Sequence, residues 1–167
     1  LKRTGIALKD AVEVVAIGHA VDDITSLPGD LTKLTTIAQA AKIALASAGI
    51  TASQLATVET HDCFSIAGIL GMEAIGLAED GKGADFVLEG HTARNGKIPV
   101  NTTGGLIGWG HPTGATGVHQ AVTIWEQMTG RAGAAQINIP ADKPYGLSIN
   151  MGGDDKTVVA IVYRKTV

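Results

Sequence analysis

Apolar residues in the first third of the chain follow two different repeats. Residues 11–20 form a run rich in valine and isoleucine, about one strand long, which favours a buried β-strand. In residues 32–48 the apolar side chains return at every third or fourth position, which is the spacing of one face of a helix. We expect Asp30 or Thr32 to cap this helix and Gly49 to end it.

The rest of the chain continues this alternation of strands and helices. The patterns predict strands at 57–60, 145–150 and 157–164 and helices at 65–77 and 115–128. We expect Gly130 to end the helix at 115–128, and Gly5 to end the tail of a helix at 2–9. Residues 79–90 are expected to form a loop with at most a short helical piece, and residues 91–99 a run of turns. Because a short glycine turn at 151–155 joins the last two strands, we expect them to pair antiparallel.

This order of elements predicts an α/β fold. The expected architecture is a layered domain in which a mixed β-sheet with an antiparallel edge is covered by helices. No internal repeat or low-complexity linker divides the sequence, and 167 residues are enough to bury one core. We therefore expect residues 1–167 to form one domain.

The composition narrows the class of function. Hydrophobic residues make up 45% of the chain and charged residues 17%, which is typical of a globular domain rather than a disordered one. The net charge is −3 and no basic run is longer than Lys2-Arg3, so a nucleic-acid partner is not expected. No apolar stretch approaches the roughly 20 residues that span a bilayer.

Cysteine usage bears on the compartment. A single cysteine excludes an internal disulfide, which fits a reducing environment. We expect a cytoplasmic location, with mitochondria and peroxisomes left open, although residues 165–167 do not form a peroxisomal tripeptide.

The first segment with candidate chemistry is His61-Asp62-Cys63-Phe64. Cys63 lies where a predicted strand gives way to a predicted helix, so we expect the amides of the helix N-terminus to lower the pKa of its thiol. Strand ends are also where ligands collect in α/β sheets. The alternative is a buried, unreactive cysteine that serves as a small apolar side chain.

The second segment is the glycine-rich stretch 104–117. It holds six glycines and places His111 between Gly110 and Pro112, directly before a predicted helix. A nucleotide site is excluded because no lysine follows the glycines and no strand precedes them with dinucleotide spacing. The alternative is a purely structural turn.

The third segment is Asn150-Met151-Gly152-Gly153, between the last two strands. Its glycine amides could face an oxyanion, and the alternative is an ordinary hairpin turn. Zinc ligands could come from five residues, but these show no CxxC or HxxxH spacing and we expect no metal site; they are His61, Asp62, Cys63, His111 and His119.

These three segments together resemble the thiolase superfamily. The sequence GHPTGATG at 110–117 is similar to the GHPxGATG loop of thiolases, and HDCF at 61–64 falls at the position of their NEAF loop. HDCF is the variant of the sterol-carrier-protein-2-type and archaeal-like thiolases. Asn150 stands where ordinary thiolases carry the cysteine of CxGG.

The resemblance implies a role for four residues. Cys63 would be the general acid/base that takes or returns the α-proton. His111 would activate a nucleophilic cysteine and help to stabilise the thioester oxyanion. His61 would position a water or polar partner in that oxyanion site, and the backbone N–H of Gly152 would serve a second oxyanion hole.

The resemblance also implies that catalysis requires a part of the enzyme that this chain does not contain. Thiolases form an acyl-enzyme on a second cysteine in an N-terminal half, and here the one cysteine is already assigned. We therefore expect a C-terminal catalytic half that lacks its first strand, the N-terminal domain and the loop domain, and that is inactive alone. A fragment of a longer protein is favoured over one chain of a split enzyme.

The implied reaction is that of an acyl-CoA C-acyltransferase, which cleaves or forms 3-ketoacyl-CoA by Claisen chemistry. A coenzyme A thioester would be the substrate, no cofactor would be bound covalently, and the enzyme would be a homodimer or homotetramer. Two alternatives stay open: a thiolase-like aldol lyase, which would carry tyrosines in place of the catalytic Cys and His, and a non-catalytic protein that binds acyl-CoA or a partner.

Overall fold

The computed structural model describes residues 4–166, which fold around one mixed sheet. The strands are β1 (Val12–Val21), β2 (Leu55–Glu59), β3 (Tyr145–Gly152) and β4 (Thr157–Lys165), and the helices are α1 (Thr35–Ala48), α2 (Ser65–Ile75), α3 (Gly83–Leu88), α4 (Gly105–Trp109) and α5 (Thr116–Thr129). The strand order is β1-β4-β3-β2, with β4 antiparallel to both neighbours and β2 parallel to β3. The predicted α/β class and mixed sheet are confirmed.

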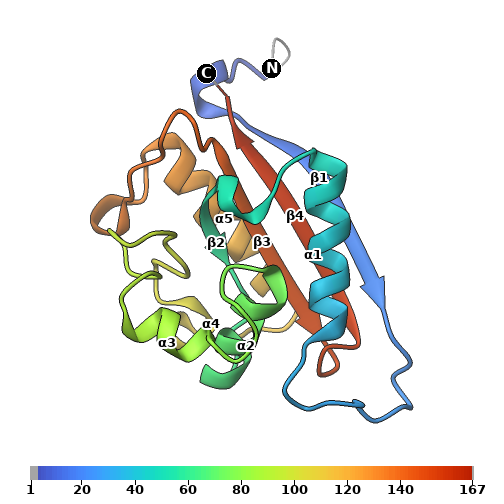
Figure 1. Ribbon diagram of the computed structural model, residues 1–167. Helices are drawn as coiled ribbons and strands as arrows, with labels where there is room; N and C mark the ends of the chain where they lie inside the picture. Colours follow the sequence, from blue (N-terminus) through green and yellow to red (C-terminus); the bar gives the residue numbers. More distant parts are fainter. Residues whose placement is uncertain (1–3, 167) are drawn as a thin grey trace.

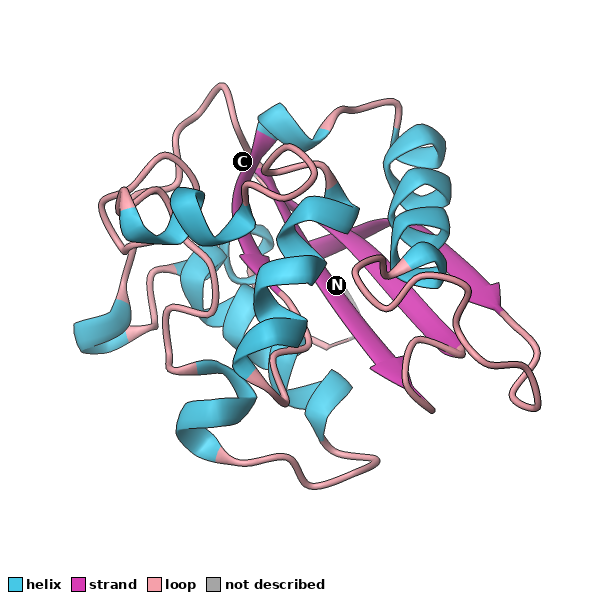
Figure 2. Ribbon diagram, turned by 60° about the horizontal axis from the view of Figure 1, so that its bottom comes forward, coloured by secondary structure: helices cyan, strands magenta, loops and turns pink. Residues whose placement is uncertain are grey.

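Helices cover the two faces of the sheet unequally. On one face α1 packs along β1 and β4, with α2 beside it, whereas α5 lies on the opposite face against β3 and β2 (Figures 1 and 2). The main core lies between α1, α2 and the sheet, and a smaller cluster lies beneath α5. The side chains that fill the main core without exposed surface include Ile37, Ala40, Val58, Leu147, Ile149 and Val158.

Glycines in two strands permit close approach of a helix. A Cβ at Gly18 of β1 would overlap the backbone of α1 at Ala40. A Cβ at Gly146 of β3 would lie 2.8 Å from the end of Met128 and 3.2 Å from Ile124, both on α5. Glycine inside a strand weakens it, and its usual reason is such an approach by another element.

The glycine stops predicted for α1 and α5 are confirmed, whereas the helix predicted at 65–77 ends earlier, at Gly76. Gly49, Gly76 and Gly130 follow α1, α2 and α5 directly and adopt left-handed backbone conformations with φ of 68°, 84° and 75°. A left-handed residue that ends a helix is most often glycine because it has no Cβ.

The predicted cap of α1 was wrong. The helix begins at Thr35, and its first amides, those of Thr36 and Ile37, each donate to the carboxylate of Asp155 at 2.9 Å. Asp155 lies in the turn between β3 and β4, so a residue remote in sequence caps this helix. Asp30 instead accepts bonds from the backbone and hydroxyl of Thr32 within its own turn.

Three other expectations needed correction. The described part of the predicted helix tail at 2–9 forms only a 3-10 turn at Leu8–Asp10, and residues 2 and 3 lie outside the described residues. The glycine-rich stretch contains the short helix α4. The antiparallel pair β3–β4 lies in the middle of the sheet, and β1 forms the antiparallel edge.

On the face that α5 covers, the helix reaches β4 and β1 only near Tyr163 and Val12. Because α5 covers β3 and β2, apolar side chains stay exposed on the outer half of that face, with Ile17 at 56% and Val21 at 62%. No helix among residues 4–166 is long and apolar enough to cross a membrane.

Candidate functional site

Three loops meet at the carboxyl ends of β2 and β3. They are the loop between β2 and α2, the loop before α5 and the turn between β3 and β4. These loops border a cavity of about 890 Å³, and the four predicted site residues all line it: His61, Cys63, His111 and Gly152. The cavity lies at the sheet edge where α/β folds collect ligands.

His61 is buried beneath this cavity. Its Nδ1 makes a short hydrogen bond with Oδ1 of Asn150 on β3. Because a carbonyl oxygen can only accept, Nδ1 carries the proton and Nε2 holds the lone pair. Burial lowers the pKa of His61, an effect that the bond to Asn150 partly offsets and the neighbouring His111 reinforces.

The last glycine of the GHPTGATG loop makes room for Asn150. A Cβ at Gly117 would lie 3.1 Å from Nδ2 of Asn150, which is tighter than ordinary contact. The amide that stands in place of the usual cysteine therefore fits against the start of α5. Asn150, in the third segment, therefore contacts both other segments, at His61 and at Gly117.

His111 stands at the exposed mouth of the cavity. Its Nδ1 lies 2.6 Å from the hydroxyl of Thr116, and that hydroxyl donates to the carbonyl of Pro112 at 3.3 Å. With the hydroxyl proton directed to Pro112, Nδ1–H of His111 donates to Thr116 and Nε2 is left as the acceptor. The His61 and His111 rings meet edge to face, with 4.8 Å between their centroids.

Cys63 lies between β2 and α2, half-buried. The expected lowering of its pKa was wrong: burial raises the pKa of the thiol. The backbone N–H groups of Cys63 and Phe64 oppose this shift, whereas the charges of Asp62 and Asp154 add to it. The thiol form therefore predominates at neutral pH.

Gly152 ends β3 at the wall of the cavity, and its carbonyl accepts the N–H of Lys156 at 3.1 Å. The turn that follows is left-handed at Gly153, Asp154 and Asp155, with φ of 64°, 58° and 63°. Non-glycine residues adopt this conformation rarely, and Asn and Asp do so most readily.

Asp62 and Asn101 fix the loops around the cavity. Asp62 accepts the N–H of Leu106 at 2.7 Å and so holds the start of α4. Asn101 accepts the N–H of Thr60 at 2.8 Å and donates to its carbonyl at 3.1 Å. Sequence reasoning did not single out Asn101, although an asparagine beside a glycine-rich stretch is a signal for the positive φ, 49°, that it adopts.

Glu59 and Gln120 are buried polar residues that sequence reasoning also missed. Gln120 Nε2 donates to the carbonyl of Ile149 at 3.2 Å and lies 3.5 Å from that of Glu59, so it bridges β3 and β2. Burial, and then the charge of Asp62, raises the pKa of Glu59 to about 8.

An apolar wall completes the cavity on the side of α1 and α2. Its side chains are Leu31, Leu34, Phe64, Ile66, Ala67 and Leu70.

His119 lies outside the cavity lining. It stacks on Trp109, with 3.7 Å between ring centroids. Among residues 4–166 no three His, Cys, Asp or Glu side chains are grouped so that they could hold a metal ion.

The fold and the three converging loops define a thiolase-like domain. The chain belongs to the family described as thiolase C-terminal domain-like, whose sequence model matches residues 18–165. The resemblance noted from the HDCF and GHPTGATG segments is thereby confirmed at the level of the family.

Two relatives and one solved structure show how far the similarity extends. The chain is 38% identical over 136 residues to the acetyl-CoA acetyltransferase of Methanothermobacter thermautotrophicus and covers 35% of that protein. It is 38% identical over 123 residues to human sterol carrier protein 2 and covers 22% of it. These matches cover 81% and 74% of this chain, so the chain spans about a third or less of these relatives.

The solved structure shares the fold. It is titled Ltp2-ChsH2(DUF35) aldolase, and it matches with a TM-score of 0.78 at 16% identity, over 92% of this chain and 39% of that chain.

Proposed function

We propose that this chain is the C-terminal catalytic part of an acyl-CoA C-acyltransferase that cleaves or forms 3-ketoacyl-CoA thioesters. The observation that carries the proposal is the single cavity that Cys63, His61, His111 and Gly152 share. The relative named acetyl-CoA acetyltransferase supports the class of reaction.

Cys63 serves as the acid/base on the α-carbon. In the cleavage direction an acetyl-CoA enolate leaves when the acyl group transfers to a nucleophilic cysteine, and the Cys63 thiol gives its proton to the enolate carbon. In the condensation direction the Cys63 thiolate removes the same proton. Because burial raises the pKa of Cys63, the free site holds the acid form that cleavage needs.

His111 serves as the base for the nucleophile. The bond from its Nδ1–H to Thr116 leaves the Nε2 lone pair to accept the proton of a cysteine thiol. Once protonated, Nε2–H donates to the thioester oxyanion. His61, held by its hydrogen bond to Asn150, orients a water or polar group in the same oxyanion site. The N–H of Gly152 donates to the oxyanion in a second oxyanion hole.

The nucleophilic cysteine comes from an N-terminal half, since the one cysteine of this chain has another role. If that half packs against the exposed face of β1 and β4, it would bury the apolar side chains of this face. The chain alone is expected to be inactive, and the assembled enzyme is expected to form a dimer or tetramer. Coenzyme A enters as the thioester substrate.

The first test measures thiolysis of acetoacetyl-CoA by a protein that contains this chain together with the N-terminal half. Cys63→Ala and His111→Ala should each lower kcat by about a thousandfold, the upper range for loss of an acid/base or nucleophile-activating group. His119→Ala is the matched control, because His119 lies outside the cavity, and it should keep its rate within about twofold.

Two further readouts separate the alternatives. Cys63→Ala should also stop deuterium exchange into the methyl group of acetyl-CoA, and full exchange in this variant would contradict the acid/base assignment. A protein that binds acyl-CoA but neither cleaves nor condenses it would support the non-catalytic alternative. Retro-aldol cleavage without thiolysis would support the lyase.

A further inference from the structure

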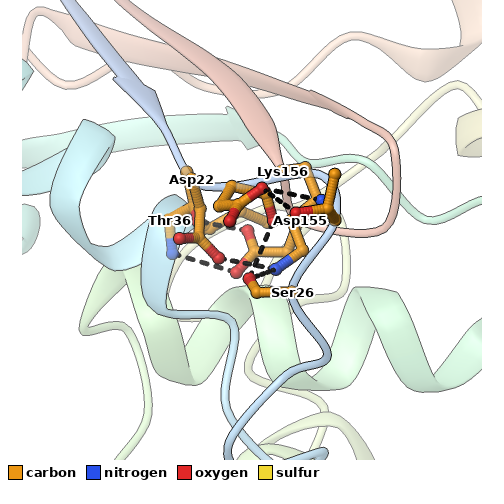
Figure 3. A network of polar contacts seen from close by, with 8 residues as sticks. Asp22, Ser26, Thr36, Asp155 and Lys156 are labelled. Carbon is orange, nitrogen blue, oxygen red and sulfur yellow. Dashed lines mark hydrogen bonds and ion pairs between the residues drawn. The ribbon is translucent and has the colours of Figure 1, made fainter.

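Lys156 fastens the segment 22–34 to the turn between β3 and β4. Its ammonium group forms an ion pair with Asp22 at 2.6 Å and donates to the hydroxyl of Ser26 at 3.2 Å (Figure 3). The backbone joins as well, because the N–H of Asp22 donates to the carbonyl of Lys156 at 2.8 Å. Lys156 is only 6% exposed, so the ion pair is shielded on the lysine side.

The neighbouring residue holds the other end of the same segment. Asp155 accepts the N–H groups of Thr36 and Ile37 where α1 begins (Figure 3). One turn therefore anchors the segment 22–34 twice, once just after β1 and once at the start of α1.

The anchored segment supplies part of the apolar wall of the cavity. Leu31 and Leu34 line the cavity, and Gly152, Gly153 and Asp154 line it as well. Leu31 is 79% exposed, so contacts of its own side chain do not hold it in place. Its position depends on the anchors at either end of the segment and on the ion pair that the nearby Lys33 forms with Asp80.

The turn is also closed independently of these anchors. The N–H of Lys156 donates to the carbonyl of Gly152, and the β3–β4 ladder continues up to Gly152 and Thr157. Loss of the lysine side chain should therefore release the segment 22–34 more than the glycine turn.

We propose that Lys156 determines acyl-chain specificity by holding the Leu31–Leu34 wall at a set distance from the glycine turn. We expect this wall to favour 3-ketoacyl-CoA thioesters with a longer apolar acyl group, which offers more apolar surface to Leu31 and Leu34, over acetoacetyl-CoA, which offers only a methyl group. This proposal rests on the proposed function, and it adds a specificity-determining residue to it.

The test compares 3-ketooctanoyl-CoA with acetoacetyl-CoA in the protein that has both halves. Lys156→Met keeps the length of the side chain and removes its charge, and the half-exposed Asp22 stays solvated. The ratio of kcat/KM values, medium-chain over acetoacetyl, should fall about fivefold or more, mainly through KM of the longer substrate, as expected when apolar contacts of a few methylenes weaken. Lys156→Arg should keep most of the preference.

Glu13→Gln is the matched control. It breaks the Glu13–Arg164 pair, another cross-strand ion pair at 2.6 Å, which lies at the other end of the sheet from the cavity. The ratio of kcat/KM values should not change in this variant.

Leu31→Ala gives a second measurement should Lys156→Met fold poorly. It shortens the wall directly, and it leaves the core intact because Leu31 is exposed. An unchanged substrate ratio in an active Leu31→Ala or a folded, active Lys156→Met variant would overturn the specificity proposal alone. A wild-type protein that folds but cleaves neither substrate would overturn the proposed function and this inference with it.

Discussion

Glu59 lies at the end of β2, two residues before His61, and is 1% exposed. Neither of its carboxyl oxygens reaches full hydrogen-bond geometry with a described residue, and the nearby N–H of Thr102 offsets the upward pKa shift only in part. A buried carboxylate without a counter-charge is costly, and the group avoids that cost by keeping its proton. The end of β2 that leads to His61 therefore carries a neutral acid at neutral pH.

This burial predicts a dependence of stability on pH. The pKa of Glu59 is about 8 in the folded chain against an ordinary value of 4.5. Between these values the folded state holds a proton that the unfolded state has lost, so raising the pH favours unfolding. The free energy of unfolding should fall by about 1.4 kcal/mol per pH unit on this account, and the loss should end above the folded pKa.

Urea unfolding of the wild type and of Glu59→Gln at pH 5, 6, 7 and 8 measures the effect. The difference between the two proteins isolates Glu59 from His61, whose lowered pKa acts in the opposite direction below about pH 6.5. A difference that stays constant over this range would contradict the buried neutral acid.

Among single residues, the sequence predicts those that belong to a contiguous motif. Cys63, His111 and Gly152 each stand in a recognisable segment, and the structure brings these segments together. Gln120 on α5 and Glu59 at the end of β2 stand in no such segment, and their burial follows only from how the helix packs on β2 and β3. The pKa direction of Cys63 was mistaken for the same reason, because burial is a tertiary property.

Among the elements, α1 depends most on a distant residue. Its N-cap position, Leu34, offers no side-chain hydrogen bond, and the carboxylate of Asp155 satisfies two of its first amides. Four amides at a helix start lack partners within the helix, so such an acceptor stabilises the whole element. The ends of α1 and α5 could be predicted because the glycine that ends each helix follows it directly in the sequence. The start of α1 could not be predicted, because the residue that caps it is remote in sequence.

Asp155→Asn should therefore lower the free energy of unfolding by about 1 kcal/mol, the usual scale for a weakened N-cap. Asparagine tolerates the left-handed backbone at this position, where φ is 63°. The comparison is Asp30→Ala, which removes the residue expected from sequence to cap α1 and should cost less than about 0.5 kcal/mol. Equal losses in the two variants, measured by urea unfolding, would show that Asp155 has no special role as a cap.

For the whole molecule, the uncovered face of β1 and β4 is the main unexplained surface. Ile17 and Val21 project from it, and a groove of about 600 Å³ runs between α5 and β4 beside them. Exposed apolar surface of this kind marks an interface in a folded protein. Under the proposed function the N-terminal half covers it, and the chain alone should self-associate through it.

Ile17→Asp should keep the isolated chain monomeric where the wild type associates as its concentration rises. Ile17 is 56% exposed, so the change should leave the fold intact. Leu88→Asp is the control, because Leu88 is 85% exposed but lies on α3, away from this face. Size-exclusion chromatography over a range of concentrations measures the outcome, and equal behaviour of both variants would argue against this face as the interface.

The first and last strands pair along their full length, with Val12 opposite Lys165, so both ends of the described chain emerge side by side (Figure 1). They emerge at the end of the sheet remote from the cavity, because β4 begins beside Gly152 and runs away from it for nine residues. At roughly 3.3 Å per residue that separation is about 30 Å. Under the proposed function, the N-terminal half has to bring its cysteine to a cavity at the other end of the sheet. The way in which the two halves dock, rather than the connection between them, would then set the geometry of the reacting atoms.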